Sequence, residues 1–222
     1  MKASRLLVRD LAQLVSPAGT GAPLRGNELG RVDQVNDAYL LIEDGRIAAV
    51  GRLRELRPLS GDVEELDGRG LCAVPGLVDC HTHPTFAGDR VDEFSLRAGG
   101  ASYEELHAAG GGILSTVRAA RAAGSDGLAA AVRQHRAWML RAGTTTFEAK
   151  SGYGLDRETE LASLHAIRTA GGVATWLGAH AVPPEFDGDG DAYLDVALRD
   201  VLPEAARIAE AADVFLERGA FD

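Results

Sequence analysis

Two histidines separated by a single residue, His81 and His83, directly follow an apolar, strand-like stretch at residues 70–80. Alternate side chains of an extended strand point to the same side, so Asp79, His81 and His83 share one face. Two neutral imidazoles in this arrangement can bind one metal ion from the end of a rigid strand. The pattern indicates a metal site, and the structural alternative is a pair of histidines that only cap a strand.

Three later strand-like stretches, residues 144–149, 173–179 and 213–217, also end in side chains that can bind a metal or a substrate. These are Glu148, Lys150 and Tyr153 at the first, His180 at the second, and Glu217 and Arg218 at the third. In a barrel of parallel strands the carboxyl ends open on one face, which carries the chemistry. Strand ends are often polar simply because they approach solvent, but four in succession favour a functional face.

Helical patterns separate these strands. Residues 126–142 and 157–170 have apolar positions at helical spacing, with Asp156 placed to cap the second helix, and a further helical pattern covers residues 191–211. A capping box at residues 102–105 predicts one more short helix. Alternation of strand and helix predicts parallel β/α units.

The first 75 residues have the character of a small β domain. Asp44-Gly45 separates two apolar runs, which is a strong signal for a β-hairpin, and Asp67-Gly68 separates two more. We therefore expect a small β-sandwich or partial barrel over residues 1–75 and a separate α/β domain over residues 76–222.

Composition limits the classes of function. The chain has 222 residues, is 45% hydrophobic and carries a net charge of -10. That charge argues against nucleic-acid and acidic-membrane partners, and the sequence contains no long apolar stretch that predicts a membrane span. Two cysteines are too few for a secreted disulfide framework. We expect a reduced, cytoplasmic protein.

Several segments together resemble a known family. Residues 75–83 are similar to the first-strand signature of the amidohydrolase superfamily, and the chain more narrowly resembles the imidazolonepropionase family of histidine degradation. The narrower resemblance rests on residues 81–90, 110–116, 150–154 and 177–183. It implies a metal-dependent (β/α)8 barrel, of the TIM-barrel type, preceded by a small β-sandwich, and a homodimer for the full-length protein.

The resemblance also implies a reaction, the hydrolytic opening of the ring of 4-imidazolone-5-propanoate to N-formimidoyl-L-glutamate. One Zn²⁺ or Fe²⁺/Fe³⁺ ion per subunit would lower the pKa of its water to about 7 and polarise the ring carbonyl. His81 and His83 match the first two metal ligands of the family. The residues that match substrate contacts are Arg90, whose planar fork suits the propionate, Tyr153 and His180, with Tyr103 as a weaker candidate.

The resemblance has one large gap. Only about the first four β/α units of the barrel are expected here, so the remaining metal ligands and the acid–base residues of the family have no counterpart. We therefore expect no catalytic residue within this span, and we interpret the chain as the N-terminal portion of the enzyme, inactive alone. The fourth strand offers Glu217 and Arg218 and no lysine, which favours a single metal ion.

Other hypotheses remain open. Another mononuclear amidohydrolase, such as a deaminase, would share the two histidines, and a non-catalytic half-barrel remnant would bind only a metal or a partner. A sugar- or nucleotide-binding α/β domain is disfavoured because no predicted strand is followed by a glycine-rich phosphate loop.

Overall fold

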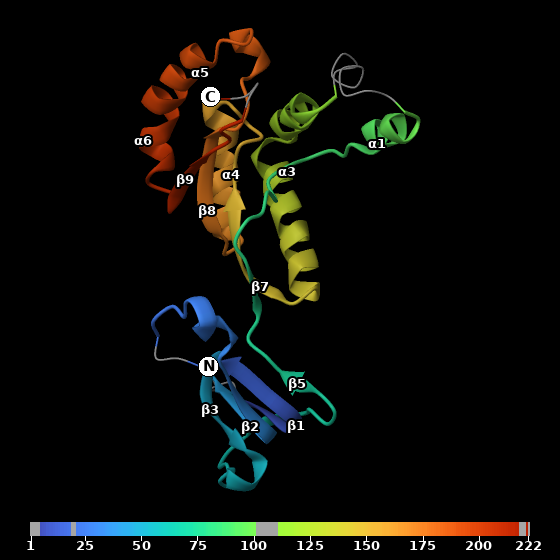
Figure 1. The fold of residues 1–222 in the computed structure, drawn as a ribbon, viewed down its shortest axis with the longest axis vertical. Helices are drawn as coiled ribbons and strands as arrows, with labels where there is room; N and C mark the ends of the chain where they lie inside the picture. The colour runs from blue at the N-terminus through green and yellow to red at the C-terminus, as the bar shows by residue number, and fades with distance from the viewer. Residues whose placement is uncertain (1–4, 19–20, 101–110, 218–220, 222) are drawn as a thin grey trace. The chain divides into compact units, whose positions relative to one another are not determined.

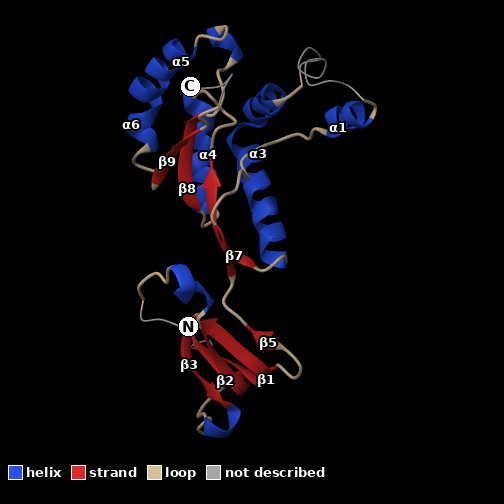
Figure 2. Cartoon of the chain, in the orientation of Figure 1, coloured by secondary structure: helices blue, strands red, loops and turns tan. Residues whose placement is uncertain are grey.

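The computed structural model describes residues 5–18, 21–100, 111–217 and 221. The chain divides into two compact units, Met1–Pro75 and Gly76–Asp222. Strands predominate in the first unit and helices in the second (Figure 2). Among the described helices, none is long and apolar enough to cross a lipid bilayer.

The strands of the first unit form one five-stranded sheet in the order β3-β2-β1-β4, with β5 also paired to β1. The strands are β1 (Arg5–Pro17), β2 (Val32–Glu43), β3 (Arg46–Arg52), β4 (Glu64–Asp67) and β5 (Cys72–Ala73), with short 3-10 helices η1 (Gly26–Gly30) and η2 (Leu53–Glu55). The described residues of this unit contain no second sheet facing the first, so the β-sandwich stays a prediction.

The two Asp-Gly turns have different roles in this sheet. At the first, Asp44 and Gly45 have φ angles of 50° and 74°, which suits a tight hairpin, and β2 and β3 pair antiparallel as expected. The second hairpin prediction is wrong, because β4 and β5 do not pair with each other and both run parallel to β1. The Gly68 amide donates instead to the Arg9 carbonyl at 2.8 Å, so this turn carries the chain along β1.

Four parallel strands form the sheet of the second unit in chain order, β6-β7-β8-β9. They are β6 (Leu77–Asp79), β7 (Thr144–Lys150), β8 (Val173–Ala179) and β9 (Ala211–Val214). The described connections contain α1 (Val91–Ala98), α3 (Ile113–Arg141), α4 (Arg157–Thr169), η3 (Pro184–Phe186), α5 (Gly190–Val196), the π-helical turn η4 (Ala197–Val201) and α6 (Leu202–Ala205). Figure 1 shows this alternation of strand and helix along the chain.

The β/α alternation of this unit agrees with the sequence, with local differences. Strands β7 and β8 and helix α4 lie where expected, and the Asp156 carboxylate caps α4 by accepting the Thr159 amide at 2.7 Å. Helix α3 begins well before residue 126, and Gly124, with φ 60° and ψ -175°, kinks it. Strand β9 covers 211–214 rather than 213–217. The helix predicted at residues 102–105 lies outside the described residues.

The core of the second unit lies between the sheet and its helices. Phe147 from β7, Trp176 from β8, and Leu164 and Ile167 from α4 are all buried in one cluster. The outer strands are different, since Val78 on β6 is 69% exposed and every residue of β9 is exposed. The sheet is therefore fully covered only around β8.

Candidate active site at the carboxyl ends of the parallel strands

His81 and His83 lie just beyond the end of β6, in a segment that is tied to β7 through the residue between them. The Thr82 amide donates to the Glu148 carboxylate at 3.2 Å, and the Thr82 hydroxyl donates to the Glu148 carbonyl at 2.6 Å. The Lys150 amide in turn donates to the Thr82 carbonyl at 2.9 Å. With Thr82 bound on three sides, the two imidazoles project from a fixed piece of backbone.

The spacing of these imidazoles fits a shared metal ion. The Nε2 atoms of His81 and His83 lie 3.3 Å apart. Two nitrogens that are each about 2.0–2.1 Å from a tetrahedral Zn²⁺ lie about 3.3–3.4 Å from one another. The described residues contain no group of three or more His, Cys, Asp or Glu side chains placed to hold a metal. This part of the chain therefore offers two ligands of suitable chemistry and geometry.

The surroundings of His83 favour its neutral form. Burial lowers the pKa of His83 to about 4, with further contributions from the nearby His180 and His81 rings. Metal ions bind the deprotonated imidazole, so a lowered pKa removes proton competition at neutral pH. The buried Nδ1 atom of His83 has no hydrogen-bond partner among the described residues.

A cation lies beside the histidines, held by two carboxylates. The Lys150 ammonium is 2.9 Å from both the Glu148 and the Asp213 carboxylates. Burial opposes the charge, but bonds to these carboxylates raise the pKa of Lys150 overall. Glu148 and Lys150 therefore form an ion pair. Asp213 joins it from β9, a contact that no local signal in the sequence predicted.

His180 follows β8 and is oriented by the loop after β7. Its Nδ1 atom lies 2.8 Å from the Gly152 carbonyl, which can only accept a hydrogen bond, so Nδ1 carries the proton and Nε2 is an acceptor. Burial lowers the pKa of His180, which favours this neutral form. The side chain can therefore accept a hydrogen bond from an N–H group of a ligand.

A pocket of about 340 Å³ lies next to the histidines, since Tyr153 both lines it and neighbours His83. Its size suits a small molecule. Residues 86–90, Thr116 and Tyr153 line it. Two of the residues predicted to contact substrate, Arg90 and Tyr153, thus meet in one pocket. Burial raises the pKa of Tyr153, so its hydroxyl keeps its proton at neutral pH and can donate.

Arg90 is itself held by a carboxylate. Its Nε donates to Glu93 at 2.8 Å, and its Nη2 contacts the same oxygen. The other Glu93 oxygen accepts the Gly112 amide at 2.9 Å and the Ser115 hydroxyl at 3.1 Å. Glu93 therefore links the guanidinium to the start of α3 and sets its direction at the pocket.

The rings of the candidate site form one cluster. The centroid of His83 lies 5.2 Å from that of His81, 6.0 Å from that of Tyr153 and 5.6 Å from that of His180. Tyr153 and His180 are 5.2 Å apart. The structure thus brings together His81, His83, Tyr153 and His180, and Arg90 lines the same pocket as Tyr153. Tyr103 lies outside the described residues.

Three further residues support the site but had not been predicted as part of it: Phe86, His135 and Glu160. His135 on α3 stacks on Phe86, with ring centroids 4.6 Å apart, and its Nδ1 lies 2.8 Å from the Pro84 carbonyl. Glu160 on α4 is fully buried beneath the loop that carries Tyr153. Glu160 could have been noticed, because it interrupts a buried helical face with Leu164 and Ile167.

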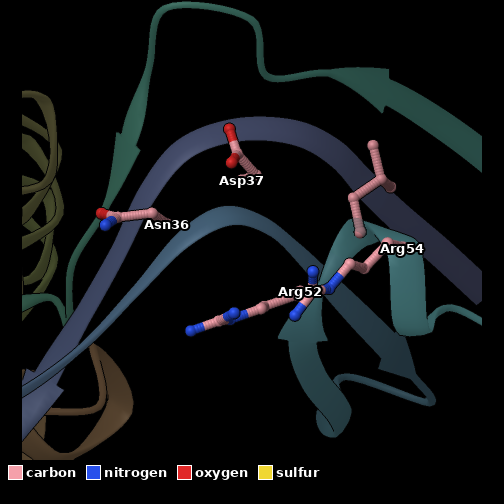
Figure 3. A pocket seen from close by; sticks show the side chains of 5 residues that line it. Asn36, Asp37, Arg52 and Arg54 are labelled. Carbon is pink, nitrogen blue, oxygen red and sulfur yellow. The ribbon is translucent and has the colours of Figure 1, made fainter.

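A second cavity, of about 560 Å³, lies in the first unit. Figure 3 shows its labelled side chains, Asn36 and Asp37 from β2 and Arg52 and Arg54 from the end of β3 and η2. These four side chains are exposed and include no nucleophile with an adjacent base. The chemistry of the described residues is therefore concentrated in the second unit.

Comparison with known proteins gives the following matches. No family model matches the chain. An imidazolonepropionase of Rubrobacter xylanophilus is 54% identical over 100% of this chain and 55% of that protein. An imidazolonepropionase of Solibacter usitatus is 45% identical over 94% of this chain and 52% of that protein.

Among solved structures, guanine deaminase from C. acetobutylicum with bound guanine in the active site has a TM-score of 0.53 at 14% identity. The likeness covers 96% of this chain and 46% of that one, and it concerns the fold alone. The chain spans about half the length of the curated relatives it matches. Along its whole length, this chain is homologous to the imidazolonepropionases.

Proposed function

We propose that this chain provides the first half of the barrel of a metal-dependent hydrolase that opens the ring of 4-imidazolone-5-propanoate. The observation that carries the proposal is the 3.3 Å spacing of the His81 and His83 Nε2 atoms next to a pocket lined by Arg90 and Tyr153. The similarity to imidazolonepropionases supports the choice of substrate. The product would be N-formimidoyl-L-glutamate.

In this proposal His81 and His83 hold one Zn²⁺ or iron ion, which would supply Lewis acidity and an activated water at neutral pH. The remaining metal ligands and the proton-transfer groups would come from the second half of a (β/α)8 barrel, which would also cover the exposed residues of β6 and β9. The small sheet of residues 1–75 would be part of a β-sandwich in the same protein.

The residues of this chain would bind and orient the substrate. Arg90 would pair with the propionate, because a guanidinium fork matches a carboxylate. His180 would accept a hydrogen bond from a ring N–H through Nε2, since its Nδ1 already donates to Gly152. The protonated hydroxyl of Tyr153 would donate to a ring or carbonyl acceptor. Together these contacts would present the ring carbonyl to the metal side of the pocket.

The direct test uses the protein encoded by the complete reading frame that contains these residues. Purified protein would be assayed with 4-imidazolone-5-propanoate, guanine and dihydroorotate, and product formation would be followed by mass spectrometry. We expect ring opening of imidazolonepropionate alone. Turnover of guanine would establish a deaminase instead, and metal binding without turnover of any of the three would support a non-catalytic remnant.

A further inference from the structure

Glu160, in the first turn of α4, is a buried carboxylate surrounded by hydrogen-bond donors. Its side chain accepts the amides of Gly152 at 3.0 Å, Gly154 at 2.8 Å and Leu155 at 3.1 Å, and the Ser151 hydroxyl also bonds to it. The residue is 1% exposed. Burial raises the pKa of Glu160, and these donors oppose that shift because they stabilise the ionised form.

These donors all come from one loop, residues 151–155, which connects β7 to α4. The loop wraps around the carboxylate, so its backbone direction is set by Glu160 rather than by a regular turn. The Ser151 hydroxyl additionally accepts the Leu177 amide at 3.1 Å and ties the loop to β8. The carboxylate therefore acts as the centre on which this loop is folded.

Two glycines make this wrapping sterically feasible. Gly152 has φ +104°, and a Cβ atom there would lie 2.8 Å from the Leu177 carbonyl oxygen and 2.9 Å from His180 Nδ1. A Cβ atom on Gly154 would lie 2.8 Å from the Glu160 amide nitrogen. The loop can approach both β8 and α4 this closely only without side chains at these two positions.

The same loop places two residues of the candidate site. Tyr153 lies between Gly152 and Gly154, whose amides both bond to Glu160, and its ring lines the pocket. The Gly152 carbonyl accepts the Nδ1 proton of His180, so the amide side of Gly152 is held by Glu160 and its carbonyl side holds His180. Gly152 thus connects Glu160 to both Tyr153 and His180, although Glu160 does not line the pocket.

We propose that Glu160 is a positioning residue for substrate recognition, which fixes the ring of Tyr153 and the Nδ1-protonated tautomer of His180 through the loop 151–155. The inference rests on the proposed function for its substrate, but the placement of His180 can be tested without substrate.

The test compares Glu160→Gln with Glu158→Gln in the protein from the complete reading frame. Glu158 is an exposed glutamate in the same turn of α4, so the control makes the same chemical change outside the loop. In Glu160→Gln an NH2 group would replace one of the two oxygens that accept the Gly152 amide, so two donors would face each other there even if the remaining oxygen kept the other amides. With histidine labelled by ¹⁵N, wild type and Glu158→Gln should show one His180 tautomer, and Glu160→Gln should show a shifted or mixed signal.

Kinetics with 4-imidazolone-5-propanoate provide the second measurement. Because a displacement of about 1 Å in a substrate-orienting group can cost on the order of a hundredfold, we expect kcat/KM to fall by about that factor in Glu160→Gln and not in Glu158→Gln. Should Glu160→Gln fail to fold, Ser151→Ala removes one donor and should cause the same changes to a smaller extent.

The outcomes separate the two proposals. A changed His180 signal in Glu160→Gln, together with an inactive wild type, would overturn the proposed substrate and leave the positioning role supported. An active wild type, with the His180 signal and kcat/KM unchanged in Glu160→Gln, would overturn the positioning role. An active wild type, together with a changed His180 signal and a lowered kcat/KM in Glu160→Gln, would support both proposals.

Discussion

At the scale of single residues, Arg90 is the side chain whose role is most open to measurement. It lines the pocket, and Glu93 sets its direction. In the protein from the complete reading frame, Arg90→Ala should lower kcat/KM by roughly 30- to 150-fold, mainly through KM, because a charge-assisted bond is worth about 2–3 kcal/mol. Arg90→Lys should recover little, since an ammonium cannot reproduce the fork.

The matched control is Arg97→Ala, which removes an exposed arginine from α1, the helix that begins directly after Arg90, and lies outside the pocket. Its kinetics should equal those of the wild type. Unchanged kcat/KM in Arg90→Ala would remove this residue from the substrate site.

The lowered pKa of His83 predicts that the stability of the metal-free protein depends on pH. Its folded-state pKa is lowered from 6.5 to about 4, so between these values the unfolded chain binds more protons than the folded one. The free energy of unfolding should therefore increase from pH 4 to pH 6.5, and this contribution should be constant at higher pH. Denaturant unfolding across this range, with a chelator present, measures it.

His83→Gln should show a flatter pH profile than the wild type. His165→Gln, which changes an exposed histidine on α4, should keep the profile of the wild type. Equal slopes for wild type and His83→Gln would contradict the lowered pKa.

At the scale of elements, Gly152 shows how a close approach between loops constrains one residue. Both Gly152 and Gly171 have positive φ, 104° and 79°, but only at Gly152 would a Cβ atom meet other atoms within 4 Å. Gly171→Ala should therefore cost about 1 kcal/mol from backbone strain alone. Gly152→Ala should cost about 2–3 kcal/mol, because the Leu177 carbonyl and the His180 ring must also move.

Thermal or denaturant unfolding of both variants in the same protein provides the comparison. The difference between the two losses of stability gives the cost of the close approach at Gly152, since the backbone strain is common to both variants. Equal losses of stability would contradict the tight packing between the loop after β7 and the end of β8.

Elements with strong local signals were predictable from the sequence. Helix α4 has a capping aspartate and a regular apolar face, β7 is β-branched, and the β2–β3 hairpin has an Asp-Gly turn. The parallel pairing of β4 and β5 with β1 was missed, because pairing between distant strands leaves no local pattern. The predicted helix at residues 126–142 began just after the kink at Gly124, and the part of α3 that precedes this kink was not predicted.

The residues of the candidate site were likewise predictable only in part. Its histidines, Arg90 and Tyr153 were named from residue types and a family resemblance, and the structure adds that they are neighbours. The partners that hold them were not predictable in the same way. Asp213 reaches Lys150 from another strand, and Glu160 bonds to backbone amides, which any sequence contains.

At the scale of the whole molecule, the outer strands β6 and β9 and the residues that follow them expose apolar side chains. Val78 is 69% exposed, Val214 51% and Leu216 72%. Exposed apolar surface on open sheet edges favours association. Residues 1–222 expressed alone should therefore form oligomers or aggregates in analytical ultracentrifugation at micromolar concentrations.

Leu216→Asp should reduce this association. The control, Leu29→Asp, changes a leucine that is 70% exposed in the first unit and should leave it unchanged. A monodisperse monomer of the wild-type residues 1–222, with tight stoichiometric metal and ring-opening activity, would contradict the interpretation of this chain as half of a barrel.

The most direct test of the central claim is the metal content of the protein from the complete reading frame. Elemental analysis of the wild type should give about one zinc or iron ion per chain. His81→Ala and His83→Ala should each lose the metal and the activity together, and His165→Ala should retain both. Full metal occupancy in either His81→Ala or His83→Ala would show that these two imidazoles do not hold the metal.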